Sequence, residues 1–357
     1  MQFYKKINKS NNLYIIFFST LLFINIFFTN NLNANSFKIT ALEVSEPFEL
    51  NFNKEKVINK GFRQAFSELI STIITSDDKQ KIEKTSLKTI KELVDSFTMS
   101  DEKFINNEYV VNFDVNFNKK NTLNFFEKKN IFPSIPKKKN LLLFPILVDI
   151  QKDEIYLFNK NIFYEKWNND NKRYFLLNYL LPSEDLEDVN LLSQNGNSIE
   201  DYDFKEIVDK YDLKNFIITI IYKNNNNFTI LSKIQLNKYL KIDNQKFYNI
   251  NSPEDIDLVI KKLKTTYENY WKNINQINTS IKLPLIVSLN SKKYKKIKIL
   301  EDTLSEIDQV FSFKITKINS ENIFYKIIYN GTPNKFIEDM KERNIDILTQ
   351  NENWIIK

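Results

Sequence analysis

Four carboxylates fall within five positions of the acidic loop 184–188, directly after an apolar stretch, in LLPSEDLEDVN (180–190). If this segment is helical, Asp185 and Asp188 stand three positions apart and share one face. Carboxylate oxygens are the ligands that Mg²⁺ and Ca²⁺ take in proteins. The loop also follows an expected strand, and ligands of open α/β sheets bind beyond the carboxyl ends of the strands. Asp185 and Asp188 are therefore the candidate metal ligands.

The same segment also suits the start of a helix that binds nothing. Ser183 is a capping residue, and Glu184 and Asp185 would favour the positive N-terminal end of the helix dipole. Leu186 and Val189 would then pack inward. We favour this structural interpretation and keep a divalent-metal or small-ligand site at the acidic loop as the alternative.

Most catalytic designs are excluded by composition. The chain contains no histidine and no cysteine, so Ser-His-Asp and Cys-His sites, disulfides and imidazole-based metal sites cannot form. Its three glycines, Gly61, Gly196 and Gly331, lie too far apart for a G-x-G-x-x-G or Walker loop. We therefore expect no catalytic residue, no cofactor and no enzyme activity. A hydrolase that uses two carboxylates across a cleft is a second alternative.

The N-terminus, residues 1–34, has the organisation of a secretory signal peptide. Three early lysines precede the apolar run 13–28, and the small residue Ala34 suits a cleavage position. We predict export to the periplasm. If the signal is not cleaved, residues 13–28 would anchor the chain in the inner membrane.

Apolar periodicity divides the rest of the 357-residue chain into three small units of α/β and α+β class, at residues 35–131, 140–276 and 281–357. In the first unit, we expect a strand over 37–48, helices over 56–75 and 87–97, an alternating strand over 107–118, and a short helix at Phe125 and Phe126.

The middle unit alternates strands and helices. The apolar run 141–148 predicts a strand covered on both faces, in which Pro145 indicates an edge or a bulge. Strands over 216–223 and 227–236 would pair as a hairpin. Ser252-Pro253-Glu254-Asp255 then has the chemistry of a capping box and opens a long helix.

The last unit follows the ferredoxin-like order β-α-β-β-α-β. The expected strands are 283–289, 310–318, 323–330 and a final strand near the C-terminus, with helices from 297 and from Pro333.

Three short motifs carry a resemblance: PSEDLED (182–188), YDLK (211–214) before an apolar strand, and YNG (329–331) between a strand and a helix. With the signal peptide, they resemble an exported proteobacterial family catalogued as domain of unknown function two thousand and sixty-six. The usual glycine of the family's second motif is Leu213 here. The resemblance spans most of the chain after residue 34. It implies a periplasmic protein without assigned activity and supplies no catalytic residues.

The densest basic patch has lysines at 292, 293, 295, 296 and 298 around Tyr294. We expect a solvated helix face, and contact of Lys292–Lys298 with a membrane surface is the alternative. We expect no nucleic-acid binding, because half of the formal net charge of +6 lies in residues 1–34 and the strand IFYKIIYN (323–330) lacks the glycine of an RNA-stacking motif.

The sequence thus predicts an exported, non-catalytic binding or scaffolding module of the cell envelope with an envelope protein as its partner. The exposed edges of the ferredoxin-like unit are expected to accept a partner strand.

Overall fold

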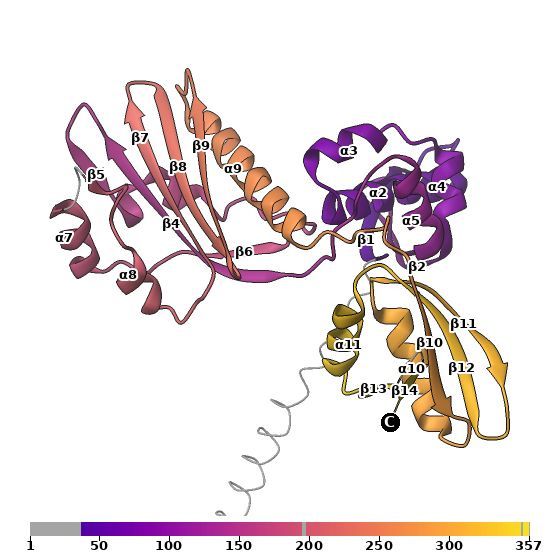
Figure 1. Cartoon of the computed structure of the whole chain (residues 1–357). Helices are drawn as coiled ribbons and strands as arrows, with labels where there is room; N and C mark the ends of the chain where they lie inside the picture. Colours follow the sequence, from indigo (N-terminus) through magenta and orange to yellow (C-terminus); the bar gives the residue numbers. More distant parts are fainter. Residues whose placement is uncertain (1–36, 195–197, 351–352, 357) are drawn as a thin grey trace, which may run out of the picture. The chain divides into compact units, whose positions relative to one another are not determined.

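The computed structural model of this chain describes residues 37–194, 198–350 and 353–356, which contain three separate sheets (Figure 1). The expected signal peptide, 1–34, lies outside the described residues. Within the described part of the chain, no helix combines the length and the apolar character that a bilayer crossing requires. The mixture of helices and strands around three sheets confirms the α/β and α+β class in three small units.

The first sheet is antiparallel and has the order β1-β3-β2. Its strands are β1 (Lys38–Pro47), β2 (Val94–Ile105) and β3 (Glu108–Phe117). Its helices are α2 (Lys54–Ile73), α3 (Ser76–Ile82), α4 (Leu87–Leu93) and α5 (Lys119–Lys128). The alternation of β3 is confirmed, since every second residue from Tyr109 to Phe117 is buried in the core of this unit.

One expected helix of this unit is wrong at its end. The helix predicted over 87–97 stops at Leu93, and Val94 and Phe97 begin β2, which the sequence did not reveal. Phe97 pairs with Val115 of β3, and its ring stacks 6.2 Å from that of Phe113. The spacing of these apolar residues imitates a helix, but pairing with β3 decides their conformation.

The middle sheet has the order β5-β4-β7-β8-β9, with β6 also paired to β4. Its strands are β4 (Lys139–Asp149), β5 (Glu154–Tyr156), β6 (Leu177–Leu180), β7 (Phe216–Asn224), β8 (Asn227–Leu236) and β9 (Tyr239–Phe247). Its helices are η1 (Phe158–Lys160), α6 (Ile162–Lys166), α7 (Leu186–Gln194), α8 (Lys205–Asp209) and α9 (Pro253–Ile274). The expected capping box is present at the start of α9, between Ser252 and Asp255.

Helices lie on both faces of this sheet (Figure 1). One core joins α9 to Leu141 and Leu143 of β4, and the other joins α8 to Leu142 and Phe144. Successive residues of a strand point to opposite faces, so a continuous apolar run is what a doubly covered strand requires.

Pro145 marks no bulge, because β4 pairs with β7 in unbroken register, but the expected edge is present locally on the side of β4 that faces away from β7. On the other side of β4, β6 pairs up to Leu142 and β5 begins to pair at Leu147. Pro145 falls between them, and its carbonyl accepts a hydrogen bond from Nδ2 of Asn161 at 3.0 Å. The N and O atoms of a strand residue point to the same side, so the missing N–H removes no ladder bond.

The third sheet has the order β11-β12-β10-β14-β13. Its strands are β10 (Leu283–Asn290), β11 (Val310–Ile318), β12 (Asn322–Tyr329), β13 (Ile347–Gln350) and β14 (Asn353–Ile356), with helices α10 (Tyr294–Glu306) and α11 (Pro333–Lys341). Because β10 pairs in parallel with β14, the order β11-β12-β10-β14 is the expected ferredoxin-like arrangement. The single final strand that the sequence indicated is a hairpin, which adds β13 at the edge.

Candidate functional site

The acidic loop lies between β6 and α7, and Asp185 rather than Ser183 caps the helix. The carboxylate of Asp185 accepts the N–H of Glu187 at 2.8 Å, and its carbonyl accepts the N–H of Val189 at 3.1 Å. The N–H of Ser183 instead donates to the hydroxyl of Tyr211 at 2.9 Å. A capping carboxylate of this kind stabilises a helix by about 1 kcal/mol.

The orientation of α7 differs from the expected one. Leu186, expected to pack inward, is 74% exposed, whereas Val189 is partly buried against the core. Asp188 is completely buried. The helix therefore turns one acid of the candidate metal site toward the protein interior, where a carboxylate requires a charged or hydrogen-bonding partner.

That partner is Lys210, which follows α8. Its Nζ lies 2.8 Å from Oδ2 of Asp185 and 2.7 Å from Oδ1 of Asp188. The hydrogen bonds to the two carboxylates, that of Asp185 first, raise the pKa of Lys210 well above its usual range. The bond from Lys210 likewise lowers the pKa of Asp185. The structure thus brings the two predicted ligands together, around a lysine ammonium.

A metal ion in this place would have to displace that ammonium. In the ranges that the structure describes, no cluster of three or more acidic side chains is arranged to hold a metal ion. The other oxygen of Asp188, Oδ2, is buried without a hydrogen-bond partner. Metal binding by Asp185 and Asp188 remains a prediction. No sequence signal marked Lys210 as a partner, because it lies more than twenty positions from either acid.

The loop and the second motif of the family resemblance meet here. Lys210 bonds to the acidic loop, Tyr211 accepts from Ser183 directly before it, and the next residues turn into β7. Asp212 has a φ of 50°, in the left-handed region that favours glycine. The position in this motif whose backbone a glycine would relieve is Asp212. Aspartate tolerates this conformation better than most residues.

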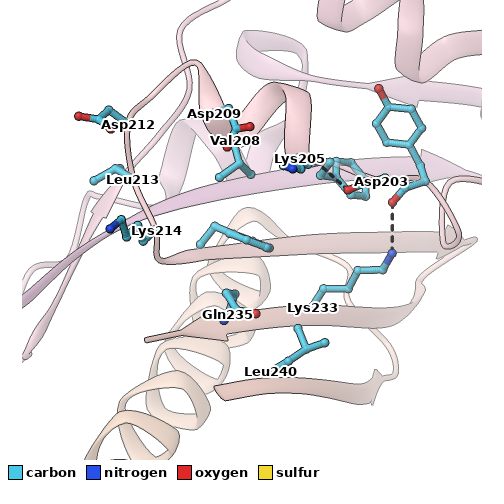
Figure 2. Close-up of a pocket in the computed structure, with 13 residues that line it drawn as sticks. Asp203, Lys205, Val208, Asp209, Asp212, Leu213, Lys214, Lys233, Gln235 and Leu240 are labelled. Carbon is cyan, nitrogen blue, oxygen red and sulfur yellow. Dashed lines mark hydrogen bonds between the residues drawn. The ribbon is translucent and has the colours of Figure 1, made fainter. Parts of the chain in front are cut away.

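A cavity of about 650 Å³ lies beside this junction, between α8 and the strands β7, β8 and β9 (Figure 2). Its apolar lining includes Phe204, Val208, Phe216 and Leu240. Its charged lining consists of three aspartates and three lysines, at positions 203, 209, 212, 205, 214 and 233. Such a mixture of an apolar wall and a few charges is typical of a binding site.

Lys233 of β8 is a charged group of the cavity wall that contacts a carbonyl oxygen and an aromatic ring. Its ammonium lies 3.4 Å from the carbonyl oxygen of Tyr202, to which it donates, and 5.5 Å from the centre of the Phe204 ring (Figure 2). Among the described residues, no carboxylate lies within 4.0 Å of it. An ammonium has three donors, so Lys233 can still bind a carboxylate of a ligand.

The floor of the cavity ends at β9, a strand that we did not predict from the sequence. Leu240 pairs with Gln235 and Ile242 pairs with Lys233, so both apolar side chains share the face of the cavity. Leu240 is 66% exposed and Ile242 is 62% exposed. The sequence signal that could have revealed β9 is Asn237, a residue type that favours tight hairpin turns. It takes a positive φ of 54° in the two-residue turn between β8 and β9.

No family model matches the chain. No curated protein matches it either.

Proposed function

We propose that this chain is an exported, non-catalytic binding module of the cell envelope that takes an extended segment of a partner protein at β9. The observation that carries the proposal is the open edge of the middle sheet. Among the described strands, β9 pairs with β8 alone, over nine residues in unbroken register. Its outer N–H and C=O groups are therefore free to pair with another chain.

The side chains of β9 also support a role in binding. Proteins usually protect an exposed edge with charges, bulges or a short strand. Here Lys241 and Lys246 are charged, but Tyr239, Leu240 and Ile242 are exposed apolar residues on a long, regular strand. An added strand would cover them, and its own alternate side chains would reach the cavity.

The chemistry of the cavity indicates what such a segment contains. Leu240 and Phe204 offer apolar contact, and Lys233 offers an ammonium without a carboxylate partner within the described residues. We infer a partner segment in which every second residue is apolar and which carries a carboxylate opposite Lys233. The absence of histidine and cysteine favours binding over catalysis, since it removes most nucleophile and base designs.

The proposed place of action is the periplasm, as the N-terminal pattern and the family resemblance imply. The chain would be free after cleavage near Ala34, or held at the inner membrane by residues 13–28 if the signal is retained. The mass of the protein recovered from a periplasmic extract distinguishes a cleaved chain from an intact one.

The test is selection of displayed random peptides on residues 36–357, followed by titration calorimetry with the enriched peptides. We expect peptides with alternating apolar residues and an Asp or Glu, which protect outward-facing β9 amides from hydrogen exchange. The double variant Leu240→Glu, Ile242→Glu should weaken binding by at least about tenfold, because it places two charges on the surface that the peptide covers.

A matched control is Ile286→Glu, which changes an exposed apolar residue of the third sheet. It should leave the affinity unchanged. The proposal is wrong if no peptide is enriched, or if the bound peptide protects β11 or β13 and leaves β9 exchanging as before.

A further inference from the structure

The end of the third sheet where β10 leads into α10 is strongly basic and exposed. Five lysines lie within seven positions there, and all five are exposed. We call this surface the basic end and define it by these residues: Lys292, Lys293, Tyr294, Lys295, Lys296, Lys298, Ile299, Lys317 and Ile318. It belongs to a different sheet from the cavity and β9, so a role for the basic end is independent of the proposed function.

The charges of α10 oppose its dipole. A helix favours acids in its first turn and bases in its last. The first turn of α10 has no acidic residue and no side-chain cap, and its last turn has no basic residue. Glu301, Asp302 and Glu306 instead lie toward its C-terminal end. This arrangement of charges destabilises the helix. The lysines are therefore not explained by a contribution to the stability of α10.

Three lysines of the basic end have no acidic neighbour in the part of the chain that the structure describes. Within the described residues, no carboxylate lies within 4.0 Å of the ammonium of Lys292, Lys295 or Lys298. Their positive charges therefore add to the partial positive charge of the helix N-terminus. The clustered positive charges create a positive electrostatic potential at this end, which attracts an extended anionic surface.

Exposed apolar side chains lie among the lysines. Tyr294 is 78% exposed and Ile299 is also largely exposed. The N–H of Ser291 donates to the carbonyl of Glu321 at 2.8 Å, which ties the start of α10 to the turn between β11 and β12. Ile318, 63% exposed, ends β11 at this same turn. Figure 1 shows the β10–α10 connection and this turn at one end of the sheet.

We propose that the basic end docks on an anionic phospholipid surface. Lysines of this kind bind lipid headgroups electrostatically, while a tyrosine and two isoleucines enter the boundary between headgroups and acyl chains. A nucleic acid would use the lysines but would leave the isoleucines Ile299 and Ile318 in water. Glu321 is the acid of the turn at this end, and the lysines outnumber it.

The test is co-sedimentation of residues 36–357, which omit the apolar run 13–28, with phospholipid vesicles. We expect binding to vesicles with one-third anionic lipid, loss of binding at high salt, and no binding to neutral vesicles. The triple variant Lys292→Gln, Lys295→Gln, Lys298→Gln should lower the partition coefficient on the order of 100-fold, since each lysine contributes about fivefold near an anionic surface.

The matched control removes three exposed lysines elsewhere, by Lys88→Gln, Lys261→Gln and Lys262→Gln, with the same change of net charge. It should retain most of the binding. Tyr294→Ala should weaken binding severalfold at equal charge, which a purely electrostatic contact would not show. Equal losses in both triple variants, equal binding to neutral vesicles, or tighter binding to an RNA oligomer than to anionic vesicles would overturn the proposal.

Discussion

Replacement of Lys210 by methionine is the most informative perturbation of this protein, because it separates a structural ion pair from a metal site. Asp188 is completely buried, and the ammonium of Lys210 at 2.7 Å is its charged partner. Methionine is likewise unbranched, ends one atom earlier and carries no charge. The carboxylate of Asp188 is then left in the interior without compensation.

The expected cost follows from this geometry. Removal of one partner of a buried ion pair destabilises a protein by about 3–5 kcal/mol. Lys210 is itself one-third exposed, so water partly screens the pair, and we expect the lower figure of about 2–3 kcal/mol. For a unit of this size, that corresponds to a fall of roughly 5–10 °C in Tm.

The assay is thermal and urea unfolding followed by tryptophan fluorescence, since Trp167 and Trp271 are buried in the core of the middle unit. Lys205→Met is the matched control, because Lys205 is exposed and makes no ion pair within the described residues. Asp188→Asn in the Lys210→Met background should recover most of the loss, since it removes the uncompensated charge.

Metal ions and pH complete the experiment. If the ammonium occupies the space between the two acids, saturating Mg²⁺ or Ca²⁺ leaves the Tm of the unmodified chain unchanged. Lys210 lowers the pKa of Asp185, so the stability from that acid is present above about pH 4 and is lost as the pH falls through its lowered folded-state pKa. Lys210→Met should reduce this acid dependence.

Two results would contradict the structural role of Lys210. One is a Lys210→Met variant as stable as Lys205→Met. The other is a metal-induced rise in Tm of the unmodified chain that disappears in Asp185→Asn, which would establish the metal site.

Two further predictions concern the cores of the last and middle units. Gly331→Ala should destabilise the last unit by about 1–3 kcal/mol, because the new Cβ would lie 2.6 Å from Cε1 of Tyr329. The ring cannot swing away, since its hydroxyl donates to Asp339 at 2.6 Å; urea unfolding checks this, with the exposed Asn334→Ala as control. Burial raises the pKa of Glu268. At pH values between the unfolded-state and folded-state pKa, the folded protein therefore holds a proton on Glu268 that the unfolded chain has lost. Its contribution to the free energy of unfolding therefore falls as pH rises from about 4.5 through the raised pKa, and Glu268→Gln should remove this slope; an unchanged slope in urea titrations across that range would contradict the assignment.

Much of the fold was predictable because its signals are local. The alternation of β3, the capping box of α9 and the β-α-β-β-α-β order of the last unit depend on neighbours a few positions apart. The errors arose where distant pairing competes with a local pattern. Val94 and Phe97 continue a helical spacing, yet β3 draws them into β2.

The candidate site was only half predictable. The acidic loop is a cap with two acids side by side, as its residues indicate, but Asp185 rather than Ser183 serves as the cap. Lys210 comes from the end of α8, and the cavity beside Lys233 is lined by α8 and the strands β7 to β9. Neither therefore has a signature near the acidic loop.

Residue types and short-range periods are enough to establish the available chemistry and the succession of units. They exclude imidazole and thiol chemistry and place the lysines of the basic end together in the chain. Folding in three dimensions settles which acid is buried, which lysine neutralises it and which strand is left at the edge. Those properties depend on contacts between segments far apart in the chain, and no local pattern encodes them.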